Sequence, residues 1–270
     1  MFLFTKNLEE DLAFMKAGYE RGVFDAARLD EAVTRILALK ASLGLAEATA
    51  KDLHRDPDTA TAALGNETYR AWSREVADRA ITLVKEETGI FPITPKRFPR
   101  VLFYATENLG RAQLPMDNPA NPNARFLQML RDAGFEVTLF VPQKVTEGAQ
   151  PSVNELKSKY DLIIYSMAKK PNYQVLTRIK WDEPQGASIP IYCHTIPTVF
   201  VSFENPYYLL DVPHMRTYIN CYSDTRTTME ALLDKMMGKR PFCGVSPVDA
   251  FCGKWETRVS FGPSLELDKR

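Results

Sequence analysis

The first third of the chain carries apolar residues at the spacing of amphipathic helices. Between residues 7 and 22 they recur every three to four positions, which predicts a helix with Asn7 as its cap. A second helix is predicted over residues 25–45, with Asp25 as its cap, for the same reason. The apolar residues of the two helices are Leu8, Leu12, Met15, Tyr19, Leu29, Val33, Ile36, Leu37 and Leu43. Ahead of the first helix, the apolar residues 1–4 predict a short strand.

A third apolar stripe predicts a helix over residues 66–87. Its members are Trp72, Val76, Ala80 and Leu83. Residues 46–65 between the second and third helices are rich in Ala, Thr and Asp and predict a linker with short helical pieces. Three prolines in residues 88–100 disfavour regular structure and mark a boundary.

From residue 100 to residue 240, apolar runs typical of buried strands alternate with helical patterns. The predicted strands are residues 100–106, 136–142, 161–167, 197–203 and 217–223, and the predicted helices are residues 123–134, 152–160 and 225–239. Continuous apolar strands between helices indicate a mostly parallel sheet that is covered on both faces. The predicted fold class is therefore α/β, a three-layer α/β sandwich.

The patterns divide the chain into four segments. Residues 1–45 hold one strand and two helices, and residues 46–99 are a linker with a connecting helix. Residues 100–240 form the sandwich domain, and residues 241–270 are expected to be an irregular tail in which residues 256–261 alone look strand-like.

The charge balance excludes some classes of function. The chain has 34 basic and 34 acidic residues, and proteins that track nucleic-acid phosphates usually carry a basic excess. No apolar stretch approaches the roughly 20 residues needed to span a bilayer, and the apolar start is too short for a signal peptide. We therefore expect a cytoplasmic protein that binds neither nucleic acid nor a membrane.

The cysteines give no metal-binding pattern. Cys193, Cys221, Cys243 and Cys252 form no C-x-x-C pair, and His194 alone among the histidines adjoins one of them. We expect buried thiols that pack as small apolar residues, and a metal site or a disulfide is the alternative. No phosphate-binding glycine loop or other cofactor motif is present, so no cofactor is expected.

Three stretches carry a family resemblance, in the family's order and at about its spacing. The segment "ARLDEAVTRILALKASLGL" (27–45) resembles the one that closes the catalytic barrel of family 3 glycoside hydrolases. The segment "SREVADRAITLVKEETGIFPI" (73–93) is similar to the start of that family's second domain. Residues 201–248, with "VSFENPYYLL" and "PFCGVSPV", resemble the end of its bacterial β-N-acetylhexosaminidase-type members.

The resemblance implies a (β/α)8 barrel followed by an α/β sandwich. Residues 1–7 then fall where the eighth barrel strand belongs, so residues 1–45 would be a barrel remnant. The family's nucleophilic Asp follows the seventh strand, and in the hexosaminidase-type members a His–Asp loop lies earlier in the barrel. Neither motif occurs here, and His54, His194 and His214 lack the loop's surroundings. No catalytic residue is assigned, and the chain alone is expected to be inactive.

Four residues are candidates for contact with a sugar. Lys6 and Asn7 would follow the last barrel strand, at the end where such barrels carry their active sites. Glu204 and Asn205 follow a sandwich strand at its C-terminal end, where open α/β sheets bind ligands. The structural alternatives are a helix cap for Asn7, a solvated Lys6 and a turn around Asn205.

Aromatic residues near these candidates admit two interpretations. The stretch "FENPYYLL" (203–210) and Trp181 are expected to belong to the core, and a sugar-stacking surface is the alternative.

Three functions follow from these patterns. The first is the C-terminal part of an enzyme that hydrolyses terminal β-glycosidic bonds, with β-linked N-acetylglucosamine as the expected sugar. The second is a stand-alone α/β module that binds a carbohydrate or a protein. The third is one half of a split enzyme. The expected partners are a carbohydrate held through the barrel, and either a separate barrel fragment or a second copy of the chain.

Overall fold

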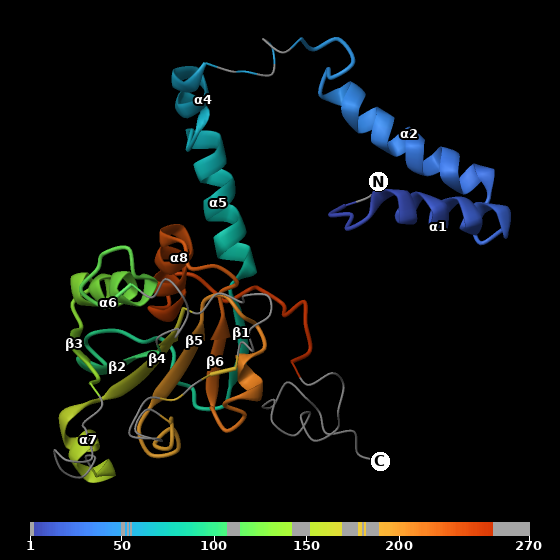
Figure 1. Ribbon diagram of the computed structural model, residues 1–270. Helices are drawn as coiled ribbons and strands as arrows, with labels where there is room; N and C mark the ends of the chain where they lie inside the picture. The colour runs from blue at the N-terminus through green and yellow to red at the C-terminus, as the bar shows by residue number, and fades with distance from the viewer. Residues whose placement is uncertain are drawn as a thin grey trace. The chain divides into compact units, whose positions relative to one another are not determined.

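The structure, a computed structural model, has two compact units, residues 1–66 and 67–270 (Figure 1). It describes residues 3–49, 52, 54, 56–106, 114–141, 152–168, 178–179, 181 and 189–250. Each unit is described by itself.

The first unit is helical. Its described helices are α1 (Leu8–Glu20), α2 (Ala26–Ser42) and α4 (Pro57–Ala63). Asn7 Oδ1 accepts a hydrogen bond from the backbone N of Glu10 at 3.3 Å, and Asp25 Oδ1 accepts one from that of Arg28 at 2.8 Å. Both predicted helices and both predicted caps are therefore confirmed, because each cap satisfies a backbone donor that the first turn leaves free.

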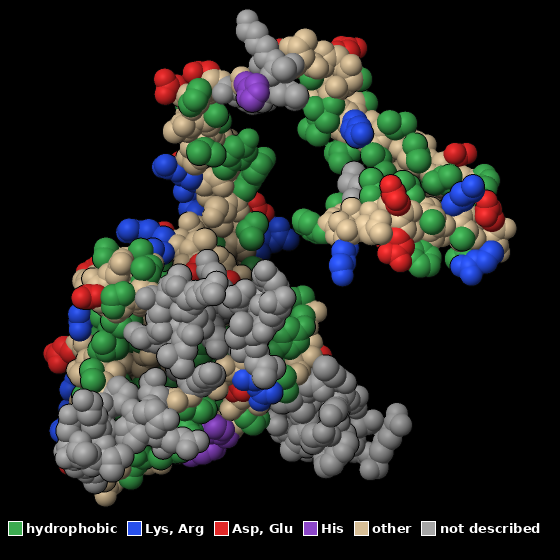
Figure 2. Space-filling model, in the orientation of Figure 1, with side chains coloured by type: hydrophobic (Ala, Val, Ile, Leu, Met, Phe, Trp, Pro, Cys, Tyr) green, Lys and Arg blue, Asp and Glu red, His purple; other side chains and the backbone are tan. Residues whose placement is uncertain are grey.

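The first unit lacks a hydrophobic core among its described residues. Gly18 is the one buried residue there, while large apolar side chains of α1 and α2 are exposed. Figure 2 shows these side chains spread over both helices. They include Leu8, Leu12, Phe14, Met15, Tyr19, Leu29, Val33, Leu37 and Leu39. The stripes that define the helices in the sequence therefore face solvent, which is unusual for a stable unit.

The predicted strand at residues 1–4 is only partly testable. Residues 1 and 2 lie outside the described part of the chain, and Leu3 and Phe4 are exposed and belong to no strand. The prediction is wrong for these two residues. A strand depends on backbone hydrogen bonds to a neighbouring strand, and nothing pairs with residues 3 and 4 among the described residues.

The second unit is built on a six-stranded sheet in the order β1-β6-β5-β4-β2-β3. The strands are β1 (Thr82–Glu86), β2 (Arg100–Thr106), β3 (Glu136–Leu139), β4 (Leu162–Met167), β5 (Thr198–Ser202) and β6 (Thr217–Asn220). β1 pairs antiparallel with β6, and every other neighbouring pair is parallel. The predicted mostly parallel α/β sheet is confirmed.

The helix predicted over residues 66–87 is wrong in about its last two turns. The observed helix α5 (Glu67–Ala80) ends at Ala80, and residues 82–86 form β1, which pairs with β6. Thr82 and Lys85 are buried, and β-branched Thr82 and Val84 fit the pleated surface of a strand. Pairing with β6 therefore outweighs the helical spacing that continues through Leu83.

Helices and loops cover both faces of the sheet (Figure 1). On one face, α6 (Pro122–Asp132) and α8 (Arg226–Met236) supply a core that includes Phe126, Leu130, Met229, Leu232 and Met236. On the other face, α7 (Val153–Lys159) and the 3₁₀ helix η2 (Tyr208–Leu210) supply Leu156, Tyr208 and Leu209. The sheet is thus the middle of three layers, as predicted.

A ladder of five aromatic rings crosses the second face. Neighbouring ring centroids are 4.2 Å apart for Phe140 and Tyr104, 4.4 Å for Tyr104 and Tyr165, 6.1 Å for Tyr165 and Phe200 and 5.3 Å for Phe200 and Tyr218. The register of the strands places the last four of these residues side by side, and Phe140 directly follows β3. The ladder packs neighbouring strands through their side chains, which stabilises the sheet beyond its backbone hydrogen bonds.

The end of the described chain is irregular. Residues 241–250 contain no helix or strand, and the strand-like residues 256–261 lie outside the described residues. Among the described helices, none combines the length and the apolar character that crossing a membrane requires.

Candidate functional site

The turn after β5 holds two of the candidate residues, Glu204 and Asn205. Asn205 is buried, and its Oδ1 accepts a hydrogen bond from the backbone N of Tyr207 at 2.9 Å. Ser202 Oγ donates to the backbone O of Asn205 at 2.6 Å. These bonds shape the turn at the C-terminal edge of the parallel strands, so Asn205 has a structural role there. Glu204 is half-buried beside it.

Neighbouring side chains extend this polar cluster into the core. Asn220, at the end of β6, donates from Nδ2 to the backbone O of Pro206 at 3.3 Å. Burial raises the pKa of Tyr208 to about 12, against a smaller opposing effect of its hydrogen bond with Asn205. The Tyr208 hydroxyl is therefore protonated at neutral pH and serves as a hydrogen-bonding group.

The other two candidates, Lys6 and Asn7, belong to the first unit. Asn7 caps α1, which accounts for its side chain, and Lys6 is exposed. The two pairs lie in different units, and each is placed within its own unit. Contact with a sugar by any of the four remains a prediction.

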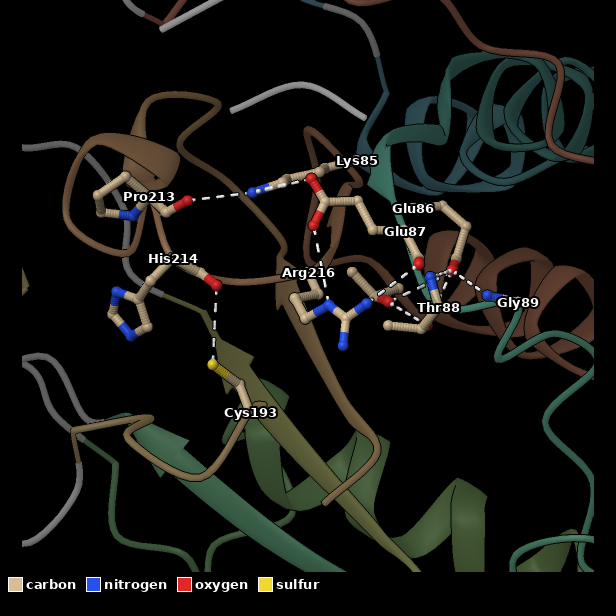
Figure 3. A network of polar contacts seen from close by, with 10 residues as sticks. Lys85, Glu86, Glu87, Thr88, Gly89, Cys193, Pro213, His214 and Arg216 are labelled. Atoms are coloured by element: carbon tan, nitrogen blue, oxygen red, sulfur yellow. Dashed lines mark hydrogen bonds and ion pairs between the residues drawn. The ribbon is translucent and has the colours of Figure 1, made fainter. Parts of the chain in front are cut away.

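A second polar network lies at the opposite edge of the sheet, where β1 ends beside the start of β6 (Figure 3). Lys85 is 5 % exposed, and its Nζ donates to the backbone O of Pro213 at 3.1 Å and lies 3.5 Å from Glu87 Oε1. Arg216 approaches the same carboxylate, with Nε 3.8 Å from Glu87 Oε2. Two cations therefore share Glu87, which compensates the charge of the buried lysine.

The carboxylate of Glu86 is occupied as well. Its Oε1 accepts hydrogen bonds from the backbone N of Thr88 at 2.5 Å and of Gly89 at 2.7 Å. Thr217 Oγ1 donates to Oε2 at 3.3 Å. Both carboxylates of the network are thus held by partners that build a turn and join two strands, an arrangement typical of a structural cluster.

Cys193 and His214 lie in the same region but do not form a nucleophile–base pair. Cys193 Sγ donates to the backbone O of His214 at 3.7 Å, and burial raises the pKa of the thiol. Burial also lowers the pKa of His214, so its imidazole is neutral at pH 7. A catalytic thiol needs a lowered pKa and an imidazole within reach, and Cys193 has the opposite shift and a carbonyl partner.

The cysteines follow the prediction in part. Cys193 and Cys221 are buried free thiols, as expected. Cys243 is a free thiol but is exposed, so the prediction is wrong for this residue, which lies on the irregular segment after α8. Cys252 lies outside the described residues. Trp181 packs against the core of the second face, and in this respect the core interpretation of the aromatic residues is correct.

Sequence reasoning missed the network of Lys85, Glu87 and Arg216. The prediction of a helix through residue 87 placed Lys85 in a helix instead of a buried strand. The signal in the sequence that favours a strand is the pair of β-branched residues Thr82 and Val84 at alternate positions, shortly before a proline-rich stretch.

Comparison with known proteins identifies relatives for nearly the whole chain. No protein-family model matches. A β-N-acetylglucosaminidase/β-glucosidase from Cellulomonas fimi is 48% identical over 263 residues, which are 96% of this chain and 45% of that protein. The chain belongs to glycoside hydrolase family 3. It matches the C-terminal part of its relatives, as the resemblance of the three motifs implied.

Solved structures agree with this assignment. The beta-glucoside phosphorylase BglX is 34% identical with a TM-score of 0.67, over 94% of this chain and 44% of that chain. A family 3 β-N-acetylglucosaminidase from Paenibacillus sp. str. FPU-7 is 19% identical with a TM-score of 0.50, over 87% of this chain and 41% of that chain, and it shows the shared fold. The chain spans less than half the length of each of these relatives.

Proposed function

We propose that this family 3 chain is the C-terminal part of an enzyme that cleaves terminal β-glycosidic bonds of glucose or N-acetylglucosamine. The observation that carries the proposal is the 48% identity to the Cellulomonas fimi enzyme over 96% of this chain. In this proposal the catalytic groups belong to a preceding barrel, and residues 1–45 supply the end of that barrel. The α/β domain of residues 100–240 then follows, extended by β1 at residues 82–86.

The exposed apolar face of α1 and α2 supports the proposal that a preceding barrel packs against these helices. Two helices that bury one glycine between them do not remove enough apolar surface from water to offset the conformational entropy of ordering them. A barrel wall that covers Leu12, Val33 and Leu37 would supply the missing burial. The stand-alone module and the split enzyme remain the competing proposals.

The polar clusters agree with a chain that does not carry out the chemistry by itself. A retaining glycosidase needs two carboxyl groups about 5 Å apart, one of them as nucleophile. In the network of Figure 3, Glu86 and Glu87 are both held by structural partners. Lys6, Asn7, Glu204 and Asn205 are proposed at most as contacts to the sugar.

The test is an assay with aryl β-glucoside and aryl β-N-acetylglucosaminide. The chain is measured alone and fused to a preceding family 3 barrel. We expect release of the aryl group by the fusion and none above buffer by the chain alone. Turnover by the chain alone that is lost when one of its own carboxylates is replaced would refute the proposal.

Phosphorolysis is a second candidate reaction. The observation that favours it is the 34% identity and the TM-score of 0.67 to a beta-glucoside phosphorylase. The same fusion is assayed with and without inorganic phosphate. A sugar 1-phosphate product and a rate that rises with phosphate would support phosphorolysis, and free sugar at a phosphate-independent rate would support hydrolysis.

A cytoplasmic location also belongs to the proposal. The described cysteines Cys193, Cys221 and Cys243 are free thiols, which is typical of a reducing compartment. Cell fractionation with an antibody against the chain tests it.

A further inference from the structure

The segment that follows α8 crosses the C-terminal end of α5. α5 and α8 lie side by side (Figure 1), and Arg240 and Cys243 both contact Asp78 of α5. Cys243 Sγ donates to the backbone O of Asp78 at 3.6 Å. A Cβ atom on Gly244 would lie 2.5 Å from the backbone O of Ala80, so the segment is pressed against the helix end.

Lys235 of α8 lies beneath this segment and is fully buried. Its Nζ is 3.1 Å from Asp78 Oδ1 and donates to the backbone O of Pro241 at 2.6 Å. Its third contact within the described residues is Cys243 Sγ, at 3.9 Å. Asp78 and Pro241 compensate the buried charge of Lys235, and Cys243 Sγ is the third partner of its amine.

Cys243 is also the one described thiol that solvent reaches. Cys193 and Cys221 are buried, whereas Cys243 is exposed. A small oxidant can therefore reach the sulfur from solvent, while the amine of Lys235 lies on the buried side of the sulfur. Oxidation of thiols follows their access to the oxidant, so Cys243 should react before the other two.

We propose that Cys243 and Lys235 are a modification site, at which peroxide joins the thiol and the amine through one bridging oxygen. The S–H bond and N–H bonds break, and an S–O bond and an N–O bond form. Two molecules of hydrogen peroxide take up the four electrons that sulfur and nitrogen lose. The thiol, the ammonium group and the two peroxides yield the N–O–S bridge, three water molecules and one proton.

The surroundings favour this product over the usual ones. The first peroxide converts the thiol to a sulfenic acid and releases one water, and the second joins the sulfenic oxygen to the amine and releases two waters and one proton. Asp78 and Pro241 hold the amine beside the sulfur, so this coupling competes with attack by a thiol from solution. The bridge replaces a non-covalent contact by a covalent one between α8 and the segment that covers α5. It also removes the positive charge of Lys235, which leaves Asp78 with Arg240, 3.3 Å away, as its cation.

The experiment is peptide mapping of the 270-residue chain after mild treatment with hydrogen peroxide. We expect one cross-linked product that joins the peptides of Lys235 and Cys243, heavier than their sum by one oxygen atom and lighter by two hydrogen atoms. Trypsin should no longer cleave after Lys235, and cleavage should return after reduction with dithiothreitol. Cys193 and Cys221 should remain unmodified thiols.

Two variants make the result specific. Cys243→Ser removes the sulfur, and Lys235→Arg keeps the positive charge but lacks the amine, so neither should give the product. Lys239, an exposed lysine whose Nζ lies 3.0 Å from Asp234 Oδ1, serves as the internal control and should stay unmodified. The proposal is overturned if wild-type Cys243 ends as sulfinic acid, sulfonic acid or an intermolecular disulfide while Lys235 stays free.

Discussion

The ion pair between Lys235 and Asp78 gives a quantitative test of how α8 holds α5. In Lys235→Met the methionine keeps most of the side-chain volume but leaves Pro241 O without its donor and Asp78 with Arg240 alone. Removal of one partner from a buried ion pair costs about 3–5 kcal/mol in general. Asp78 is 27% exposed and keeps a second cation, so we expect a smaller loss than this range, about 2–3 kcal/mol, for this site.

The assay is urea unfolding of the second unit, followed by tryptophan fluorescence and circular dichroism. The double variant Lys235→Met with Asp78→Asn removes both charges and should recover about 1 kcal/mol or more of that loss. An exposed pair, Arg226 with Glu230, provides the control, and Arg226→Met should change the free energy of unfolding by less than about 0.5 kcal/mol. A loss for Lys235→Met no larger than that of the control would refute the reasoning.

Three further predictions concern the second unit. The hydrogen bond from Arg100 lowers the pKa of Asp161 in the folded chain. The pair's contribution to the free energy of unfolding is therefore complete above pH 3.8, the ordinary value, and is lost as the pH falls through the lower folded-state pKa. Asp161→Asn should flatten the acid limb of a plot of stability against pH. Gly244→Ala should lower the free energy of unfolding by about 1–3 kcal/mol in thermal or urea unfolding, because its Cβ would meet the backbone O of Ala80 at 2.5 Å, and an unchanged value would contradict the close approach. Tyr218→Phe removes a buried hydroxyl that makes no hydrogen bond of good geometry among the described residues, so its melting temperature should stay the same or rise, and a clear fall would show that the hydroxyl has a partner.

Much of the fold follows from local patterns in the sequence. The strands from residue 100 onward are continuous apolar runs between helices, and this pattern specifies a buried parallel sheet with little ambiguity. Asn7 and Asp25 mark their helices because a cap is a local interaction between neighbours in the sequence.

The errors come from interactions that no local pattern contains. β1 is a strand because β6, more than 130 residues later, pairs with it, and helical spacing alone could not reveal that partner. Residues 3 and 4 show the reverse case, since a strand-like sequence without a pairing neighbour does not form a strand.

The candidate site was only partly predictable, for a related reason. The sequence predicts Asn205 at the end of a strand, because the apolar run of residues 197–203 stops just before it. The sharing of Glu87 by Lys85 and Arg216 depends on the pairing of β1 with β6, so it appears only in three dimensions.

The central claim is that the exposed face of α1 and α2 is the contact surface for a preceding barrel that carries the catalytic groups. The most direct test is amide hydrogen exchange of residues 8–43, measured in the chain alone and in the fusion to a family 3 barrel, alongside the aryl-glycoside assay. We expect fast exchange and no turnover for the chain alone, and slow exchange with turnover for the fusion. Slow exchange of these helices in a monomer of the chain alone would contradict the claim, because it would show that they are stable without the barrel.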